Sequence, residues 1–543
     1  MSDRRPPAVR RAAVAGTLTS AAVAVLVVVP VLAVALSAFR TDETWSTAAF
    51  ERVLTSDRTW RIVAVTVAQA VASTVLTLAV GLPVAWTLGR FEFPGRRLVR
   101  VVALVPFVLP SVVLATAVAA LLGPAGPLDL RGTWWAVLAA HAAFNLAVVV
   151  FVVGDAFGRL GASVEDAARM LGAPARGAFT RATLPAVRPA VVSAAAVVFL
   201  FCLTSFGVLV VLGGGRVTTI EVEVYFRATR QFDLSGAAVL SIVQLLCVVV
   251  ALTVVGALQR RSGAASGRVT RRAPSRAGDR WWVAATVGIV GLVAGLPMVA
   301  LLDRSFRVGR AYSWSNWTNL GSVLEGTGLA VSPIGALGRS LSAATLAAVL
   351  ATAVAVPAAV VAARRPGRLA DRVLMLPLAV SATTLGLGVL LVAGRPPIDL
   401  RDAWWLVPLV QALVALPLVV RVVAPALRAV PTNALDSAAV LGAGPRARWW
   451  RVEVPAVRGA VAAGAGLAFV ASIGEFGATV FIARVDRATV PVAIGSLASR
   501  PGAAGLGQAM ALSCLLVLIC GAVLLVVDRL GEVGRIGTAG AAD

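Results

Sequence analysis

Hydrophobic and polar positions alternate in long blocks along this chain. Apolar runs of about 20 residues, the length that spans a bilayer core, are separated by short polar stretches. The runs predict twelve membrane-spanning helices, at residues 14–39, 62–88, 98–122, 134–157, 190–212, 236–258, 281–302, 341–363, 373–393, 404–420, 460–481 and 506–527. A transmembrane β-barrel would need shorter segments of alternating hydrophobicity, which the sequence lacks. The pattern predicts an all-α polytopic membrane protein.

The polar blocks alternate in charge. Every second block is rich in Arg, and the net charge of +23 comes from Arg alone because the chain has no Lys. The positive-inside rule places the Arg-rich blocks and both termini in the cytoplasm. The opposite blocks carry acids, among them Glu221, Glu223 and Asp233, and are expected outside. This distribution explains the basic charge better than nucleic-acid binding does, since no basic face interleaved with aromatic residues is visible.

The chain repeats itself. The stretch at 127–135 returns at 397–405, Gly172 returns as Gly442, and Phe206 returns as Phe476, each 270 positions later. We predict a tandem duplication of a six-helix unit, with the copies parallel and related by an axis along the membrane normal. The expected units are residues 1–259 and 281–530. An Arg-rich cytoplasmic linker at 260–280, interpreted as a flexible join, separates them, and a cytoplasmic tail follows at 531–543.

One cytoplasmic stretch occurs in both units, at 161–185 and 431–455, and we call these the motif loops. Four positions in each carry the repeat: Asp166, Ala167, Ala168 and Gly172 in the first motif loop, and Asp436, Ser437, Ala438 and Gly442 in the second. The acid in the first turn complements a helix dipole, the small residues permit close approach, and the glycine ends the helix or allows a sharp turn. An ordinary amphipathic interfacial helix is the alternative, but duplication with preserved spacing favours a docking helix for a soluble partner.

The motif loops resemble the EAA loop of permease subunits of bacterial binding-protein-dependent ABC importers. In that pattern Glu-Ala-Ala precedes a Gly and then Leu-Pro. Here Asp replaces Glu, and Val454-Pro455 replaces Leu-Pro in the second copy. The resemblance implies a type I, MetI-like fold in the bacterial cytoplasmic membrane, and motif loops that act as coupling helices for two ATPase subunits. It also implies an extracytoplasmic binding protein that delivers a small solute.

The fused arrangement narrows the resemblance. A chain with two such units is similar to the ferric-iron and thiamine permease group. The stretches 205–221 and 472–477 resemble the thiamine permeases in particular. Thiamine or ferric iron is the cargo that this resemblance implies.

No enzyme chemistry is expected of the chain itself. A standard phosphate-binding loop needs a Lys, so ATP would be bound and hydrolysed on partner subunits, and no cofactor is expected on this chain. The single His141 has no second His or Cys at ligand spacing, so no metal site is expected.

Four polar residues within or near the apolar runs are candidates for the substrate path: Glu475, Ser205, His141 and Asn145. Glu475 is expected well inside a span, where a charge usually faces a cavity or a partner. The alternative places Glu475 near the outer end, solvated or paired with Arg484. Ser205 occupies the equivalent position of the first unit. His141 and Asn145 share one helix face, where interhelical hydrogen bonding is the alternative to substrate contact.

Two other classes stay open. An ion-coupled secondary transporter of twelve spans would need buried ionisable residues, of which only Glu475 clearly qualifies, and it leaves the motif loops unexplained. A membrane-embedded enzyme or scaffold is disfavoured because no catalytic cluster is present.

Overall fold

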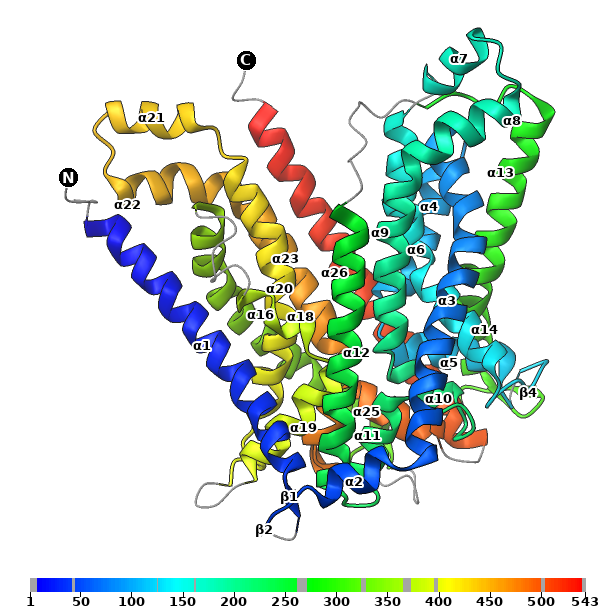
Figure 1. Ribbon diagram of the computed structural model, residues 1–543, viewed down its shortest axis with the longest axis vertical. Helices are drawn as coiled ribbons and strands as arrows, with labels where there is room; N and C mark the ends of the chain where they lie inside the picture. Colours follow the sequence, from blue (N-terminus) through cyan, green and yellow to red (C-terminus); the bar gives the residue numbers. More distant parts are fainter. Residues whose placement is uncertain are drawn as a thin grey trace.

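Helices make up nearly all of the computed structural model (Figure 1). It describes residues 7–41, 44–124, 126–160, 163–260, 271–323, 329–364, 373–394, 399–499 and 503–539. Several predicted features lie partly outside these ranges: linker residues 261–270, tail residues 540–543, residues 161–162 of the first motif loop and residues 397–398 of the repeated stretch. The all-α polytopic fold is confirmed.

Within the described ranges, ten helices or continuous helical runs are long and apolar enough to cross a membrane. They are α1 (Pro7–Ala38), α3 (Asp57–Arg90), α6 (Trp134–Leu160), α8–η1–α9 (Ala175–Ala178, Phe179–Thr183, Leu184–Leu203), α12 (Leu234–Arg260), α13–η2–α14 (Ala277–Val290, Gly291–Gly295, Leu296–Ser305), α16 (Pro333–Arg364), α20 (Leu406–Arg428), α22–η4–α23 (Pro445–Arg448, Trp449–Glu453, Val454–Ile473) and α26 (Ala503–Ala539). The last of these continues as helix through most of the predicted tail.

Four predicted spans are broken, and two of these breaks lower the predicted count of twelve to ten, or to eleven if one bent pair is counted as a span. The span expected at 98–122 is two helices, α4 (Arg96–Val108) and α5 (Ser111–Leu122), bent by 110° at Pro110. The span expected at 373–393 contains α18 (Leu376–Ala379) and α19 (Ala382–Ala393), and α19 alone is too short to cross. Proline at 110 and extended backbone at Val380 and Ser381 end the preceding helices.

The other two breaks interrupt the spans expected at 190–212 and 460–481. They fall after α9 and after α23, where the chain turns into the short helices α10 (Gly207–Leu212) and α24 (Thr479–Ile482). Each half thus has two broken spans at equivalent positions, as the duplication requires.

Short elements complete the two ends. Those at the end opposite the motif loops in Figure 1 include the hairpins β1–β2 (Arg40–Thr41, Thr44–Trp45) and β3–β4 (Arg307–Val308, Ala311–Tyr312), in which Arg40 pairs with Trp45 and Arg307 with Tyr312. The remaining short helices are α2 (Ala48–Leu54), α11 (Ile220–Thr229), α15 (Ser315–Thr318), η3 (Asn319–Gly321), η5 (Val485–Arg487) and α25 (Val490–Ser499). The motif loops carry α7 (Ser163–Met170) and α21 (Thr432–Val440).

The repeated sequence stretches adopt the same local structure in both halves. The Asp129 carboxylate accepts a hydrogen bond from the Arg131 backbone N–H at 3.3 Å, and Asp399 accepts one from Arg401 at 3.0 Å. The Arg401 guanidinium also holds the pKa of Asp399 at about 2. Phe206 and Phe476, which are equivalent residues, stack on one another with ring centroids 5.1 Å apart. Equivalent residues meet in this way near a twofold relation, which supports the predicted symmetric duplication.

The two halves exchange their first spanning helices. In Figure 1, α1 runs alongside α16, α18 and α19 of the second half, while α13 lies beside α3 and α4 of the first half. The contact of α1 with α19 is close, since a Cβ on Gly388 would lie 2.4 Å from the Pro30 carbonyl oxygen. The sequential division into units at 1–259 and 281–530 therefore describes the duplication but not the packing.

The C-terminal end of the linker is held against the first half, unlike the flexible join that its composition predicts. The Arg272 backbone N–H donates to the Arg90 carbonyl at 3.0 Å, and its own carbonyl accepts from the Glu92 N–H at 2.9 Å. The Arg272 guanidinium lies over the Phe91 ring, 5.2 Å from its centroid. These backbone contacts satisfy polar groups that a free linker would leave to water.

The exchange of first helices predicts a strong effect at Gly388. Replacing Gly388 with Ala should destabilise the protein by about 1–3 kcal/mol, because the new methyl group overlaps the α1 backbone. Gly338→Ala is the matched control, since that helical glycine is exposed and has open space around it. Thermal unfolding in detergent measures both variants. Equal midpoints for Gly388→Ala and Gly338→Ala would contradict the packing of α1 on α19.

Candidate functional site

The motif loops lie at one end of the molecule, the end at which α1 begins and α26 ends (Figure 1). In each loop a short helix, α7 or α21, is followed by a turn and then by a second helix that runs into a span. That second helix contains a π-helical turn in both halves, η1 and η4, at equivalent positions. π-helical turns are rare and often occur at functional sites, so their duplication marks this connection.

Gly172 and Gly442 make the turns. Their φ angles are +85° and +81°, in the left-handed region that favours glycine. The Ala173 N–H reaches back to the Ala168 carbonyl at 3.1 Å, and the Ala443 N–H reaches the Ala438 carbonyl at 2.9 Å. This is the hydrogen-bond pattern of a Schellman motif, which ends a helix at a left-handed residue. The predicted helix-ending role of both glycines is confirmed.

The other predicted motif residues lie on the outer surface of the two helices. Asp166, Ala167, Asp436 and Ser437 are exposed, while Ala168 and Ala438 are half-buried. The exposed small residues leave room for another surface to approach.

Sequence reasoning missed an apolar pair beside each glycine. Met170 and Leu171 are 88% and 89% exposed, and Val440 and Leu441 are 88% and 86% exposed. Large apolar side chains this exposed in a polar loop mark an interaction surface. The signal was present in the sequence, since both copies place two apolar residues directly before the glycine.

Sequence reasoning also missed the residue that anchors the first motif loop. Glu165 is buried and forms ion pairs with Arg90, at the end of α3, and with Arg169 at 2.8 Å. Arg90 in turn lies over the Trp86 ring, 5.7 Å from its centroid. The equivalent position in the second loop is Leu435, so this ion pair belongs to the first half alone.

Three of the four path candidates come together inside the first half. The His141 Nδ1 atom lies 2.8 Å from the Ser73 hydroxyl, and its Nε2 atom lies 2.9 Å from the Ser205 hydroxyl. Asn145 donates to the His141 carbonyl at 3.0 Å and to the Cys202 sulfur at 3.5 Å. His141 and Asn145 are buried. These side chains join α3, α6 and α9, so the interhelical hydrogen bonding weighed as the alternative is what the geometry supports.

Glu475 lies elsewhere than expected. It sits at the break after α23, not inside a continuous span, because Gly474 and Gly477 flank a non-helical stretch. Its carboxylate accepts hydrogen bonds from the backbone N–H groups of Ala478 at 2.8 Å and Thr479 at 2.9 Å. The alternative pairing with Arg484 is wrong as well, since Arg484 pairs with Asp402 and Asp486.

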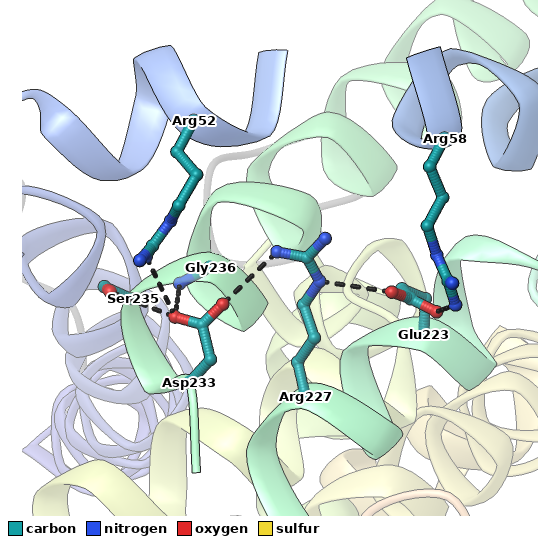
Figure 2. Close-up of polar contacts among 7 residues, drawn as sticks. All are labelled: Arg52, Arg58, Glu223, Arg227, Asp233, Ser235 and Gly236. Atoms are coloured by element: carbon teal, nitrogen blue, oxygen red, sulfur yellow. Dashed lines mark hydrogen bonds and ion pairs between the residues drawn. The ribbon is translucent and has the colours of Figure 1, made fainter. Parts of the chain in front are cut away.

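The acids predicted for an outer loop are tied into the structure. The Asp233 carboxylate forms ion pairs with Arg52 at 3.1 Å and Arg227 at 3.2 Å (Figure 2). The Glu223 carboxylate forms ion pairs with Arg227 at 3.2 Å and Arg58 at 3.1 Å. This network holds α11 against α2 and the start of α3. Glu221, on the same short helix, is buried and accepts a hydrogen bond from the Thr383 hydroxyl of the second half. Burial of Glu221 and Glu223 was not foreseen.

A family model supplies the first comparison with known proteins. The family described as binding-protein-dependent transport system inner membrane component matches the chain twice, over residues 81–263 and 351–531. The matched ranges begin 270 positions apart and contain both motif loops. The helices that the halves exchange, α1 and α13–α14, lie outside them.

Individual relatives agree with this match. The thiamine transport system permease protein of Brucella abortus is 29% identical over 257 residues, which cover 45% of this chain and 47% of that protein. The sulfate transport system permease protein of Escherichia coli is 29% identical over 229 residues, which cover 40% of this chain and 83% of that protein. The match thus spans about half the length of the thiamine relatives.

The Glu165 anchor predicts a difference between neighbouring acids. Glu165→Gln should destabilise the protein by about 3 kcal/mol, because it leaves Arg90 buried without its ion pair. Asp166→Asn, one residue along on the exposed face, is the control and should leave stability unchanged. Thermal unfolding of both variants in detergent tests this. A control that unfolds as early as Glu165→Gln would show that the loop responds to any change of charge and not to this pair.

Proposed function

The chain belongs to the family of binding-protein-dependent transport system inner membrane components, and on this premise we propose that it is the transmembrane permease subunit of an ATP-driven ABC importer. The observation that carries the proposal is the pair of motif loops. Both lie at one end of the molecule, share one turn geometry and expose an apolar pair beside the turn. A duplicated docking surface suits a pair of ATPase subunits, one for each loop.

The partners follow from this assignment. Two ABC ATPase subunits would bind the motif loops at the cytoplasmic face, and an extracytoplasmic binding protein would deliver a small solute to the opposite end. The bilayer surrounds the spans in the bacterial cytoplasmic membrane, with both termini cytoplasmic, an orientation that the alternating Arg content supports. The permease performs no bond chemistry, since ATP is hydrolysed on the partner subunits.

The mechanism uses the continuous helices that follow the motif loops. When ATP closes the ATPase pair, the two loops move with it. Each loop continues through one helical run, Arg176–Leu203 or Pro445–Ile473, to the break that carries Phe206 or Phe476. Displacement of the loops would therefore separate or join the stacked rings and switch the halves between outward-open and inward-open states.

The identity of the transported solute is a second, more specific proposal. The relatives are named for thiamine and for sulfate, and the fused arrangement resembles the thiamine and ferric-iron permeases. We favour thiamine, with ferric iron as the second choice, because the contact between the halves buries carboxylates at Glu221 and Glu475. An ionised carboxylate attracts a cation and repels an anion such as sulfate.

An ion-coupled secondary transporter is the alternative function. It would take up solute in liposomes under an ion gradient with no ATPase present. The motif loops would then have no partner, and their exposed apolar pairs would be unexplained.

The turn geometry predicts uncoupling by substitution at the two glycines. In a Gly172→Val, Gly442→Val double variant, each substitution should destabilise its turn by about 1–2 kcal/mol, because a β-branched residue disfavours a positive φ angle. ATP-driven uptake in proteoliposomes should fall while membrane insertion stays normal. Gly444→Val is the control, because Gly444 has φ −65° and open space around it. Unchanged uptake in the double variant would contradict the assignment of the motif loops as docking sites for the ATPase subunits.

The exposed apolar pairs predict ATPase binding. Leu171→Asp combined with Leu441→Asp should weaken ATPase association by about tenfold or more, since a charge replaces an apolar anchor. Co-purification of the ATPase with the membrane-inserted chain measures this. Val485→Asp, an exposed apolar residue in a loop outside both motif loops, should leave co-purification intact. Equal loss in the control would mean that any exposed charge disrupts the complex.

A further inference from the structure

Helix α11 carries two buried acids with different surroundings. Glu223 is compensated by two guanidinium groups, from Arg58 and Arg227, as Figure 2 shows. Glu221 lies two residues earlier and so projects from a different face of the helix. That face meets α19 of the second half, where the Thr383 hydroxyl donates to the Glu221 carboxylate. The arginine network fixes α11 on one side and leaves Glu221 at the contact between the halves.

Glu221 is an uncompensated carboxylate. It is 1% exposed, and over the described ranges no arginine forms an ion pair with it. The Ser381 and Gln244 side chains lie beside the carboxylate, and burial raises the pKa of Glu221 to about 8. Its Oε1 atom has no donor within hydrogen-bond geometry, and the Gln244 side chain also has a buried carbonyl oxygen without a donor. Two acceptors without donors in one buried cluster are costly to the fold, and a ligand that supplies positive charge and donors would satisfy both.

Glu475 lies close to the same point. The position that a Cβ would take on Gly477 is 3.6 Å from the Glu475 Oε1 atom and 3.7 Å from the Thr383 backbone nitrogen. The two buried carboxylates, one from each half, therefore approach the N-terminal end of α19 together. Oxygen atoms of Glu221 and Gln244 give the contact between the halves an acceptor-rich character, and Glu475 adds a carboxylate whose oxygens accept hydrogen bonds from Ala478 and Thr479.

Aromatic rings adjoin this cluster. Tyr225 lies one helical turn after Glu221, and its ring contacts Phe206 at 5.4 Å and Phe481 at 5.9 Å between centroids. Phe206 stacks on Phe476, the residue next to Glu475. Carboxylates together with aromatic faces are the groups that bind organic cations.

We propose that Glu221 and Glu475, with the neighbouring aromatic rings, form a transit site for an organic cation between the two halves. The inference rests on the proposed importer function and narrows its cargo. A bare metal ion fits poorly, since no group of three or more His, Cys, Asp or Glu side chains that could hold one occurs in the described part of the chain. Sulfate would meet two carboxylates, with which no arginine of the described residues forms an ion pair.

The test uses the full chain reconstituted with its ATPase and binding protein in proteoliposomes. Radiolabelled thiamine is the organic cation, and sulfate and ferric iron are offered separately. Glu221→Gln keeps the size of the side chain and removes its charge, and should lower thiamine uptake by about tenfold or more with ATPase association unchanged. Glu51→Gln, an exposed acid on α2, is the matched control and should transport normally.

Thr383→Val separates a transit role from a structural one. This substitution removes the hydroxyl that donates to Glu221 and leaves the Glu221 carboxylate in place. If that carboxylate contacts the transported cation, Thr383→Val should lower uptake far less than Glu221→Gln does. If Glu221 only secures α19, the two variants should lose thermal stability and uptake in parallel, which would overturn the transit site. ATP-driven uptake of sulfate or ferric iron in place of thiamine would overturn it too. No ATP-dependent uptake by the wild-type complex would instead overturn the proposed function.

Discussion

The meeting of four broken spans is the constraint on which this structure depends. A break inside a bilayer exposes backbone groups that lipid cannot satisfy, so each break needs partners within the protein. Glu475 accepts two N–H groups of α24, and the Ser381 hydroxyl accepts the Thr384 N–H at the start of α19. Close contact completes the arrangement: a Cβ on Gly477 would lie 2.9 Å from Ala382. The breaks stabilise one another, and the proposed transit site lies where they meet.

The sequence predicts the spans and the duplication, but not the breaks, the helix packing or the burial of Glu221. Run length and Arg content predicted the spans, and the 270-residue offset predicted the duplication, because both follow from local composition. The breaks were missed because an apolar run looks the same whether it is one helix or two short ones, and membrane helices tolerate proline. The exchange of α1 and α13 was missed since hydropathy does not specify which helix packs on which. Glu221 was assigned to an outer loop because its neighbours in sequence are polar. Its burial depends on how the helices pack, which the local sequence does not specify.

Duplication has preserved the scaffold while the interior has diverged. The turns at Gly172 and Gly442, the π-helical turns and the stacked phenylalanines are shared by both halves. Several buried polar side chains differ between the halves: the position of Ser205 in one half holds Glu475 in the other, and His141 corresponds to Gln411. Conserved loops suit two copies of one ATPase, whereas an asymmetric interior suits a cargo that is itself asymmetric.

Two physical connections join the first motif loop to the centre of the molecule. Both loops continue directly into the helix that ends at the break, through α9 or α23. The first loop is also held by the Glu165–Arg90 ion pair to α3, and α3 carries Ser73, which reaches Ser205 through His141. Leu435 removes that second connection from the other half. On the proposed function, a movement of the first motif loop would therefore reach α3 and α6 as well as α9. The second motif loop lacks this ion pair, continues into α23, and contacts α1 through α22.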